Sequence, residues 1–334
     1  MICELEHKIF AIVDTDFEEL ALALFRFQYE QNEVYQQYVD LLGIDPGTVT
    51  AESQIPFLPI DFFKSHPVKT TAFQPETIFE SSGTTQTTPS YHLVKNLSIY
   101  RQSFIKAFEN IYGPVQDWCI LGLLPAYLER NNSSLVTMVH ELITMSQHAE
   151  SGFYLYDHER LSEVLQLLEK NQQKTLLIGV TFALLDFAKN YQQPLHYTTV
   201  METGGMKGRR EEMTRDEIHT LLKQAWGLDT VHSEYGMTEL LSQAYSRQRG
   251  LFTSPSWMKI MLREEDDPFS IKTAGRGLIN IIDLANIYSC AFIATDDIGF
   301  VHPVGNFEVL GRRDNIDLRG CSLMAANLGS TGEG

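Results

Sequence analysis

The sequence predicts an α/β protein with helices layered on a largely parallel sheet. Two apolar runs, 118–124 and 175–180, are typical of buried strands. The stretch 157–170 has helical spacing, since four apolar residues recur on one face: Leu161, Val164, Leu165 and Leu168. Beyond residue 250 the chain becomes strand-rich, which predicts a smaller β subdomain. Short apolar strands interleaved with amphipathic helices favour this layered arrangement.

Composition limits the classes of function. The 334 residues are enough for more than one packed subdomain, and 43% hydrophobic with 21% charged residues is a globular balance that excludes disorder. The formal net charge of -17 repels polyanions, so nucleic acid is not expected as a partner. A phosphate site in such a chain must therefore be built from local dipoles and a few well-placed cations.

The cysteines and the N-terminus indicate a cytoplasmic chain. Four cysteines are widely spaced without a CxxC pair, so no zinc or redox signature appears. The first residues have neither a basic nor an apolar signal region. The most apolar stretch, 176–188, is too short for a transmembrane helix and contains Asp186, so no membrane span is expected.

The other elements follow from periodicity and from turn or cap residues. Residues 4–43 predict helices, and prolines punctuate an extended stretch at 55–68. Thr214 and Glu217 have the spacing of a capping box, which predicts the start of a helix. Further expected elements are a helix from Phe182, strands at 278–284, 290–295 and 307–310, and a flexible tail at 329–334.

Two polar motifs suggest a phosphate site. Residues 81–89 read SSGTTQTTP, in which hydroxyls and backbone N–H groups could surround triphosphate oxygens, although an ordinary polar turn has the same composition. Residues 203–210 read TGGMKGRR and bring three cations together in an acidic chain. Lys207 is the favoured functional cation, whereas Arg209 and Arg210 could equally pair with neighbouring glutamates on the surface.

Three further motifs suggest a nucleotide and its metal. In EYGMTE, residues 234–239, an aromatic ring beside glycine could stack on a base, and Glu239 at the start of an apparent helix could bind Mg²⁺ or merely complement the helix dipole. In TDDIG, residues 295–299, a carboxylate at a strand end could accept ribose hydroxyls, or the motif could be a turn. In GRRDN, residues 311–315, an arginine could grip ribose or phosphate, or form a polar turn.

The order of these motifs resembles the adenylate-forming superfamily of acyl-CoA synthetases, adenylation domains and luciferases, over about residues 55–320. The resemblance implies that the 81–85 loop binds the β,γ-phosphates, that Tyr235 stacks on adenine, and that Asp297 accepts the ribose hydroxyls. Glu239 would hold Mg²⁺. The full implied ATP site is Ser81, Ser82, Gly83, Thr84, Thr85, Gly205, Tyr235, Gly236, Thr238, Asp297 and Arg312.

Within that superfamily the chain is most similar to the acyl-protein synthetases of bacterial luminescence (LuxE-like), and next to phenylacetate-type CoA ligases. The segments 55–64, 124–130 and 202–208 carry this likeness. Gln86 departs from the usual glycine, and no lysine follows Pro89 directly. The usual C-terminal domain with its catalytic lysine is expected to be absent, so either Lys207 supplies that charge, or the enzyme is slow, or the second half-reaction differs.

The resemblance implies three segments: an N-terminal helical segment at 1–75, an adenylate-forming α/β core at 76–310, and a hinge remnant with a flexible tail at 311–334. It also implies that ATP and Mg²⁺ activate a carboxylic acid, in particular a fatty acid, as acyl-AMP. A thiol then takes the acyl group, and Cys321, a partner protein or CoA could supply it. The alternatives are an acyl- or aryl-CoA ligase and a nucleotide- or acyl-binding protein without catalysis.

Overall fold

The computed structural model describes the whole chain except residues 1, 13, 82–87, 125–131, 205–212 and 314–334. Its helices are α1 (Ile2–Ile9), α2 (Phe17–Gln31), α3 (Glu33–Leu41), α4 (Phe62–Ser65), α5 (Leu97–Tyr112), α6 (Ser134–Ser146), α7 (His158–Lys170), α8 (Thr181–Asn190) and α9 (Arg215–Trp226). Its strands are β1 (Leu58–Pro59), β2 (Thr77–Glu80), β3 (Tyr91–Val94), β4 (Cys119–Leu123), β5 (Gly152–Phe153), β6 (Thr175–Val180), β7 (Thr198–Thr203), β8 (His232–Tyr235), β9 (Ala244–Ser246), β10 (Phe252–Thr253), β11 (Met258–Arg263), β12 (Ile271–Lys272), β13 (Gly275–Asp283), β14 (Phe292–Val301) and β15 (Phe307–Arg312).

Thirteen strands of the described chain form one continuous sheet in the order β12-β11-β13-β14-β15-β10-β9-β8-β7-β6-β4-β5, with β1 beside β14. Strands β5, β4, β6, β7 and β8 are parallel, whereas the strands from β8 to β12 along this path are antiparallel. The predicted α/β layering is confirmed, but the parallel part is narrower than expected. The strand-rich region beyond residue 250 extends the same sheet.

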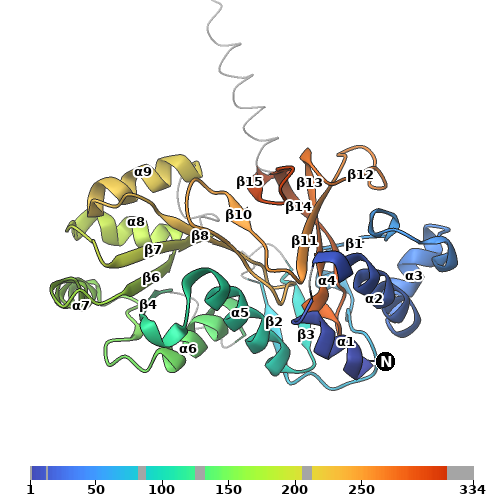
Figure 1. The fold of residues 1–334 in the computed structure, drawn as a ribbon, viewed down its shortest axis with the longest axis horizontal. Coiled ribbons are helices and arrows are strands. Elements are labelled where there is room, and N and C mark those ends of the chain that lie inside the picture. Colours follow the sequence, from blue (N-terminus) through green and yellow to red (C-terminus); the bar gives the residue numbers. More distant parts are fainter. Residues whose placement is uncertain (1, 13, 82–87, 125–131, 205–212, 314–334) are drawn as a thin grey trace, which may run out of the picture.

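Figure 1 shows how the helices cover this sheet: α8 and α9 lie on one side of the parallel strands, and α5 and α6 on the other. Burial from both sides explains why β6 is apolar along its length, since all six of its residues are buried. The predicted strand at 175–180 and the predicted helix at 157–170 are therefore confirmed, the helix beginning one residue later. The capping box at the start of α9 is also confirmed, with Thr214 accepting from the backbone of Glu217.

The N-terminal helices pack against the antiparallel end of the sheet, as Figure 1 shows. Gln28 of α2 is fully buried and donates to the carbonyls of Asn286 and Ile287 at 2.9 and 3.1 Å. Asn32 donates to Ser289 at 2.9 Å. These bonds supply donors to carbonyl groups of the irregular backbone between β13 and β14, which would otherwise be buried without a hydrogen-bond partner. No helix in the described ranges has both the length and the apolar character needed to cross a membrane.

Two local expectations are wrong. The TDD motif does not end a strand or form a turn, because β14 continues through Asp296 and Asp297 to Val301. Glu239 does not open a helix, because residues 236–243 form turns and bends between β8 and β9. Both differences change which way the motif side chains point, and both matter for the site.

Candidate active site

Three predicted residues from three separate strands meet in one cluster. Tyr235 lies at the end of β8, Asp297 in β14 and Arg312 at the end of β15. The Tyr235 hydroxyl donates to Asp297 Oδ2 at 2.8 Å, and Arg312 Nε lies 3.5 Å from Asp297 Oδ1. Asp297 and Arg312 are direct partners in the β14–β15 ladder, so the strand register itself brings them together.

The Tyr235 ring is fixed by aromatic neighbours. Its centroid lies 5.8 Å from that of Phe252 and 5.6 Å from that of Phe307. Burial, followed by the nearby Asp297 carboxylate, raises the pKa of Tyr235 well above its usual value, so the phenol remains a hydrogen-bond donor. Asp297 is 14% exposed and Arg312 42% exposed, so the polar edge of this cluster faces outward.

The turn that follows Tyr235 is held by buried polar groups from three directions. The Nδ1 atom of His92 in β3 lies 2.8 Å from the Thr238 carbonyl oxygen. Asn286 donates to the Glu239 carbonyl at 2.8 Å. Asp283 at the end of β13 accepts from the backbone N–H groups of the two residues that end the turn, Leu241 and Ser242, at 2.9 and 3.0 Å.

These contacts explain why no helix forms at Glu239. The N–H groups of Leu241 and Ser242 are bonded to the Asp283 carboxylate. Ser242 Oγ also donates to this carboxylate at 2.6 Å. Burial raises the pKa of Asp283 to about 6 even though these donors lower it, so the carboxylate is largely ionised at neutral pH. Glu239 itself is buried, with 5% exposure.

His92 also connects this turn to the hydroxyl-rich loop. It lies on β3, which pairs antiparallel with β2, and residues 81–90 connect these two strands. Next to the strand ends the N–H of Ser90 donates to Ser81 Oγ at 2.8 Å, and the N–H of Ser81 donates to the Ser90 carbonyl at 3.1 Å. The structure thus brings the base of the predicted phosphate loop next to the Thr238 turn. Burial lowers the pKa of His92 to about 4, which keeps its ring neutral at neutral pH.

Glu234 lies on the opposite face of β8 from Tyr235 and points into the protein. It is 9% exposed, and burial raises its pKa to about 7, although a hydrogen bond with Thr203 lowers it. A Cβ atom on Gly236 would lie 2.5 Å from Glu234 Oε1 and 3.3 Å from Gln243 Cγ. Any side chain at position 236 would therefore require the Glu234 carboxyl group to move.

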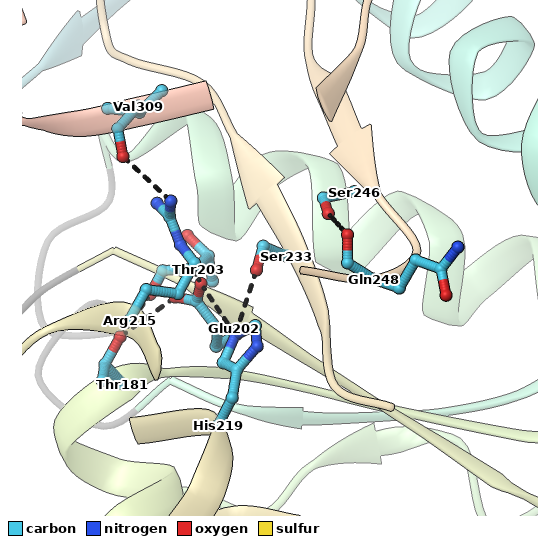
Figure 2. Close-up of polar contacts among 9 residues, drawn as sticks. All are labelled: Thr181, Glu202, Thr203, Arg215, His219, Ser233, Ser246, Gln248 and Val309. Atoms are coloured by element: carbon cyan, nitrogen blue, oxygen red, sulfur yellow. Dashed lines mark hydrogen bonds and ion pairs between the residues drawn. The ribbon is translucent and has the colours of Figure 1, made fainter. Parts of the chain in front are cut away.

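A second buried polar cluster lies at the end of β7, immediately before the lysine-containing segment (Figure 2). Its centre is Glu202, whose Oε1 lies 3.3 Å from Arg215 Nε and whose Oε2 accepts from Thr181 Oγ1 at 3.2 Å. His219 of α9 lies 3.7 Å from Glu202 Oε1 and 3.3 Å from Ser233 Oγ. Burial alone would raise the pKa of Glu202, but His219 and Arg215 outweigh it and lower the pKa below its usual value.

Arg215 links this cluster to the strand that carries Arg312. Its Nη1 donates to the Val309 carbonyl of β15 at 3.0 Å, and its guanidinium carbon lies 5.1 Å from the centre of the Phe252 ring. Figure 2 shows the side chain extending from Glu202 to Val309. In the described structure β10 pairs with β15 only through Phe252 and Phe307, and Arg215 binds β15 two residues beyond that pair, at Val309. We call Glu202, Arg215 and Val309 the β7–β15 bridge.

Several predicted site residues lie outside the described residues: Ser82, Gly83, Thr84, Thr85, Gly205, Lys207 and Cys321. Gly204, the last described residue before the Lys207 segment, directly follows β7. The residues that sequence reasoning missed are His92, Asp283 and Asn286, together with the β7–β15 bridge. His92, Asp283 and Asn286 are isolated polar residues among apolar neighbours, whereas Arg215 lies in the polar run 214–217, and no spacing pattern marked any of them.

The fold is similar to that of solved structures of ligases. ATP-bound MatB from Rhodopseudomonas palustris aligns with 72% of this chain and 49% of its own, at 14% identity and a TM-score of 0.54. A 2-hydroxyisobutyryl-CoA ligase in its postadenylation state aligns with 89% of this chain and 68% of its own, at 9% identity and a TM-score of 0.59. The chain spans about half the length of MatB. These similarities establish the fold.

The sequence itself places the chain more narrowly. It matches the family described as "Acyl-protein synthetase, LuxE" over residues 14–328, and the chain belongs to this family. A curated relative, the long-chain-fatty-acid–luciferin-component ligase of Aliivibrio fischeri, is 24% identical over 93% of this chain and 88% of its own. The predicted resemblance and the predicted enzyme class are therefore confirmed.

Proposed function

We propose that this enzyme uses ATP and Mg²⁺ to convert a fatty acid into an acyl-AMP and then passes the acyl group to a thiol. The observation that carries the proposal is the Tyr235–Asp297–Arg312 cluster beside the Thr238–Glu239 turn, in a chain of the acyl-protein synthetase family. The fatty acid is suggested by the name of the Aliivibrio fischeri relative. The nucleotide is suggested by ATP in the MatB structure.

Each residue of the cluster has a chemical role in this proposal. Asp297 accepts the ribose hydroxyls, because its carboxylate faces the outer edge of the cluster and carbohydrate hydroxyls are donors. Arg312 supports Asp297 and supplies local positive charge in a chain of net charge -17. Tyr235 provides an aromatic surface for adenine, and the Ser81 loop and Thr238 provide donors for phosphate oxygens.

The Mg²⁺ assignment agrees with the donor set. The described residues contain no group of three or more His, Cys, Asp or Glu side chains that could hold a metal ion. Mg²⁺ in ATP-dependent enzymes is typically bound through one or two carboxylates together with substrate phosphates, so a single glutamate is sufficient. Glu239 is the residue that would hold it, and bound Mg²⁺ would neutralise charge on the phosphates.

The chemistry follows from charge neutralisation and positioning. An oxygen of the fatty-acid carboxylate attacks the α-phosphorus of ATP, the bond to the β-phosphate oxygen breaks, and pyrophosphate leaves. A thiolate then attacks the acyl carbon, the bond between that carbon and the AMP oxygen breaks, and a thioester and AMP result. Lys207 is the cation that we assign to the developing charge in the first step.

The first experiment is ATP–pyrophosphate exchange with a panel of fatty acids. We expect exchange in the wild type and its loss in Asp297→Asn, while Asp296→Asn serves as a matched control because that side chain points to the other face of β14. Lys207→Ala should lower the rate of exchange with little change in ATP affinity. Absence of exchange with every acid would leave a nucleotide- or acyl-binding protein without catalysis, and equal exchange in Asp297→Asn would remove Asp297 from the site.

The second experiment identifies the thiol. The protein is incubated with ATP, Mg²⁺ and a radiolabelled fatty acid, and label that hydroxylamine releases is measured. We expect label in the wild type and none in Cys321→Ser, with Cys290→Ser as the control because that thiol is fully buried. Label that persists in Cys321→Ser would exclude Cys321. Transfer only on addition of CoA would favour the CoA ligase alternative.

A further inference from the structure

A cavity of about 510 Å³ lies against the antiparallel end of the sheet, away from the Tyr235 cluster. Its floor is formed by β11, β13 and β14, and its walls by residues 53–61 and 264–271. This volume is within the range of small-molecule sites. The residues that line it include Arg263, Asn280 and Asp296, none of which belongs to the proposed adenylate site.

The cavity and the nucleotide residues lie back to back. Successive side chains of a strand point to opposite faces, so Asp296 faces the cavity while its neighbour Asp297 faces Tyr235. The same alternation places Arg313 at the cavity and Arg312 beside Asp297. Two adjacent residues of β14 thus serve two different faces of the sheet.

Arg263 is a partly buried cation in this cavity. Its guanidinium donates to the carbonyls of Ile279 and Thr295 at 3.2 and 2.6 Å and to Asn280 Oδ1 at 2.7 Å. Across the described residues no carboxylate oxygen lies within the 4 Å of an ion pair with it. Burial lowers the pKa of Arg263, and the more distant charge of Asp296 opposes this effect. Neighbouring Asn280 is fully buried, and its Nδ2 has no acceptor within the described structure.

Asp296 provides a negative charge in the same cavity as the Arg263 cation. It lines the same cavity and lies next in sequence to Thr295, whose carbonyl binds Arg263, yet within the described ranges it forms no ion pair with that arginine. Other acidic residues of the wall are already neutralised, since Asp61 pairs with Lys64 at 2.6 Å and Glu264 pairs with Lys272. Glu265 and Arg313 are exposed at the rim. A cation and an anion are therefore held apart inside one cavity.

The remaining wall is apolar. Tyr38 and Phe57 form part of it, and the ring of Phe269 is 56% exposed at its edge. We propose that this cavity binds an α-amino acid with an apolar side chain: the carboxylate pairs with Arg263 and the Asn280 amide, the ammonium group pairs with Asp296, and the side chain covers the aromatic wall. A zwitterion satisfies both charges without adding net charge to an acidic protein.

The test is isothermal titration of the full chain, without ATP, using L-leucine and two compounds that each lack one charged group. These are 4-methylpentanoate, which lacks the ammonium group, and 3-methylbutylamine, which lacks the carboxylate. We expect saturable binding of leucine and at least tenfold weaker binding of both analogues. Asp296→Asn should weaken leucine binding at least tenfold, whereas Asp266→Asn removes a charge from a nearby exposed position outside the cavity and should not.

Arg263→Gln should weaken leucine binding similarly, but this variant also loses bonds to two strands, so Asp296→Asn is the decisive one. The proposal is overturned if leucine does not bind, if Asp296→Asn binds leucine as tightly as the wild type, or if 4-methylpentanoate binds as tightly as leucine. The proposal is independent of acid activation, because the readout is binding to the protein alone. A failed exchange assay and a failed leucine titration are therefore separate results.

Discussion

The β7–β15 bridge gives a prediction about charge and stability. Arg215→Ala removes the guanidinium from Glu202, from the Val309 carbonyl and from the face of Phe252. A hydrogen bond to a charged group contributes about 1.5–3 kcal/mol, and a cation–π contact about 0.5–1 kcal/mol. Glu202 retains Thr181 and His219 as partners, so the expected loss is about 3 kcal/mol at pH 7 rather than the full cost of an isolated buried charge.

The sign of the pH dependence distinguishes this mechanism from simple loss of packing. In the wild type the pKa of Glu202 is lowered, so its contribution to stability is present above the pKa of the unfolded state and is lost as the pH falls through the folded value. In Arg215→Ala the arginine charge that lowers the pKa of Glu202 is lost, so burial should raise that pKa above its usual value. The stability difference between the two proteins should therefore grow as the pH rises from about 4 to 7.

The assay is urea unfolding at a series of pH values, with Arg276→Ala as the control because that arginine is exposed on β13. A difference of about 3 kcal/mol at neutral pH that shrinks on acidification supports the electrostatic bridge. A difference that stays constant over the pH range would refute it and reduce Arg215 to a packing residue.

Two further predictions concern the turn and the aromatic cluster. The pKa of His92 is lowered from 6.5 to about 4, so the unfolded state binds the proton more strongly than the folded state. The free energy of unfolding should therefore fall by about 3 kcal/mol between pH 6.5 and 4. The variant His92→Asn, whose amide can still donate to the Thr238 carbonyl, should lose that pH dependence in urea unfolding. Tyr235→Phe removes the hydrogen bond from the hydroxyl to Asp297 but keeps the ring. Thermal unfolding should therefore show a loss of about 1.5 kcal/mol, and ATP should still stabilise the variant. Loss of the stabilisation by ATP would mean that the hydroxyl, not the ring, contacts the nucleotide.

The local sequence pattern was sufficient to predict elements whose buried residues recur with one regular spacing. The strand at 175–180 and the helix at 157–170 were predictable because each has one dominant period and clear end signals. The capping box of α9 was predictable for the same reason, since the bonds between Thr214 and Glu217 span only three residues of sequence. Such features depend on neighbours within a few residues of sequence.

The misread motifs depend on distant partners. Leu240 and Leu241 look helical, but the Ser242 N–H, which in a helix would donate to the Thr238 carbonyl, donates to the Asp283 carboxylate about forty residues away in sequence. The Asp296–Asp297 pair looks like a turn, but β13 and β15 flank it and each carboxylate points to its own face. For the same reason, His92 could not be identified as a support of the turn before the hairpin was placed beside it.

Glu234 is a buried carboxyl group whose ionisation costs stability at alkaline pH. Its pKa rises from 4.5 to about 7, so the folded state binds the proton more strongly, and the contribution to stability falls as the pH rises from about 4.5 through 7. By pH 8 the cost approaches about 3 kcal/mol. Glu234→Gln keeps the shape beside Gly236 but cannot ionise, so it should be more stable than the wild type at pH 8 and nearly equal at pH 5. Urea unfolding at the two pH values measures this, and equal stability at both would show that Glu234 is not held in a low-dielectric site. If Glu234→Gln is more stable than the wild type but its pyrophosphate exchange is impaired, the carboxyl group contributes to catalysis. A residue with only a packing role would leave the exchange rate unchanged.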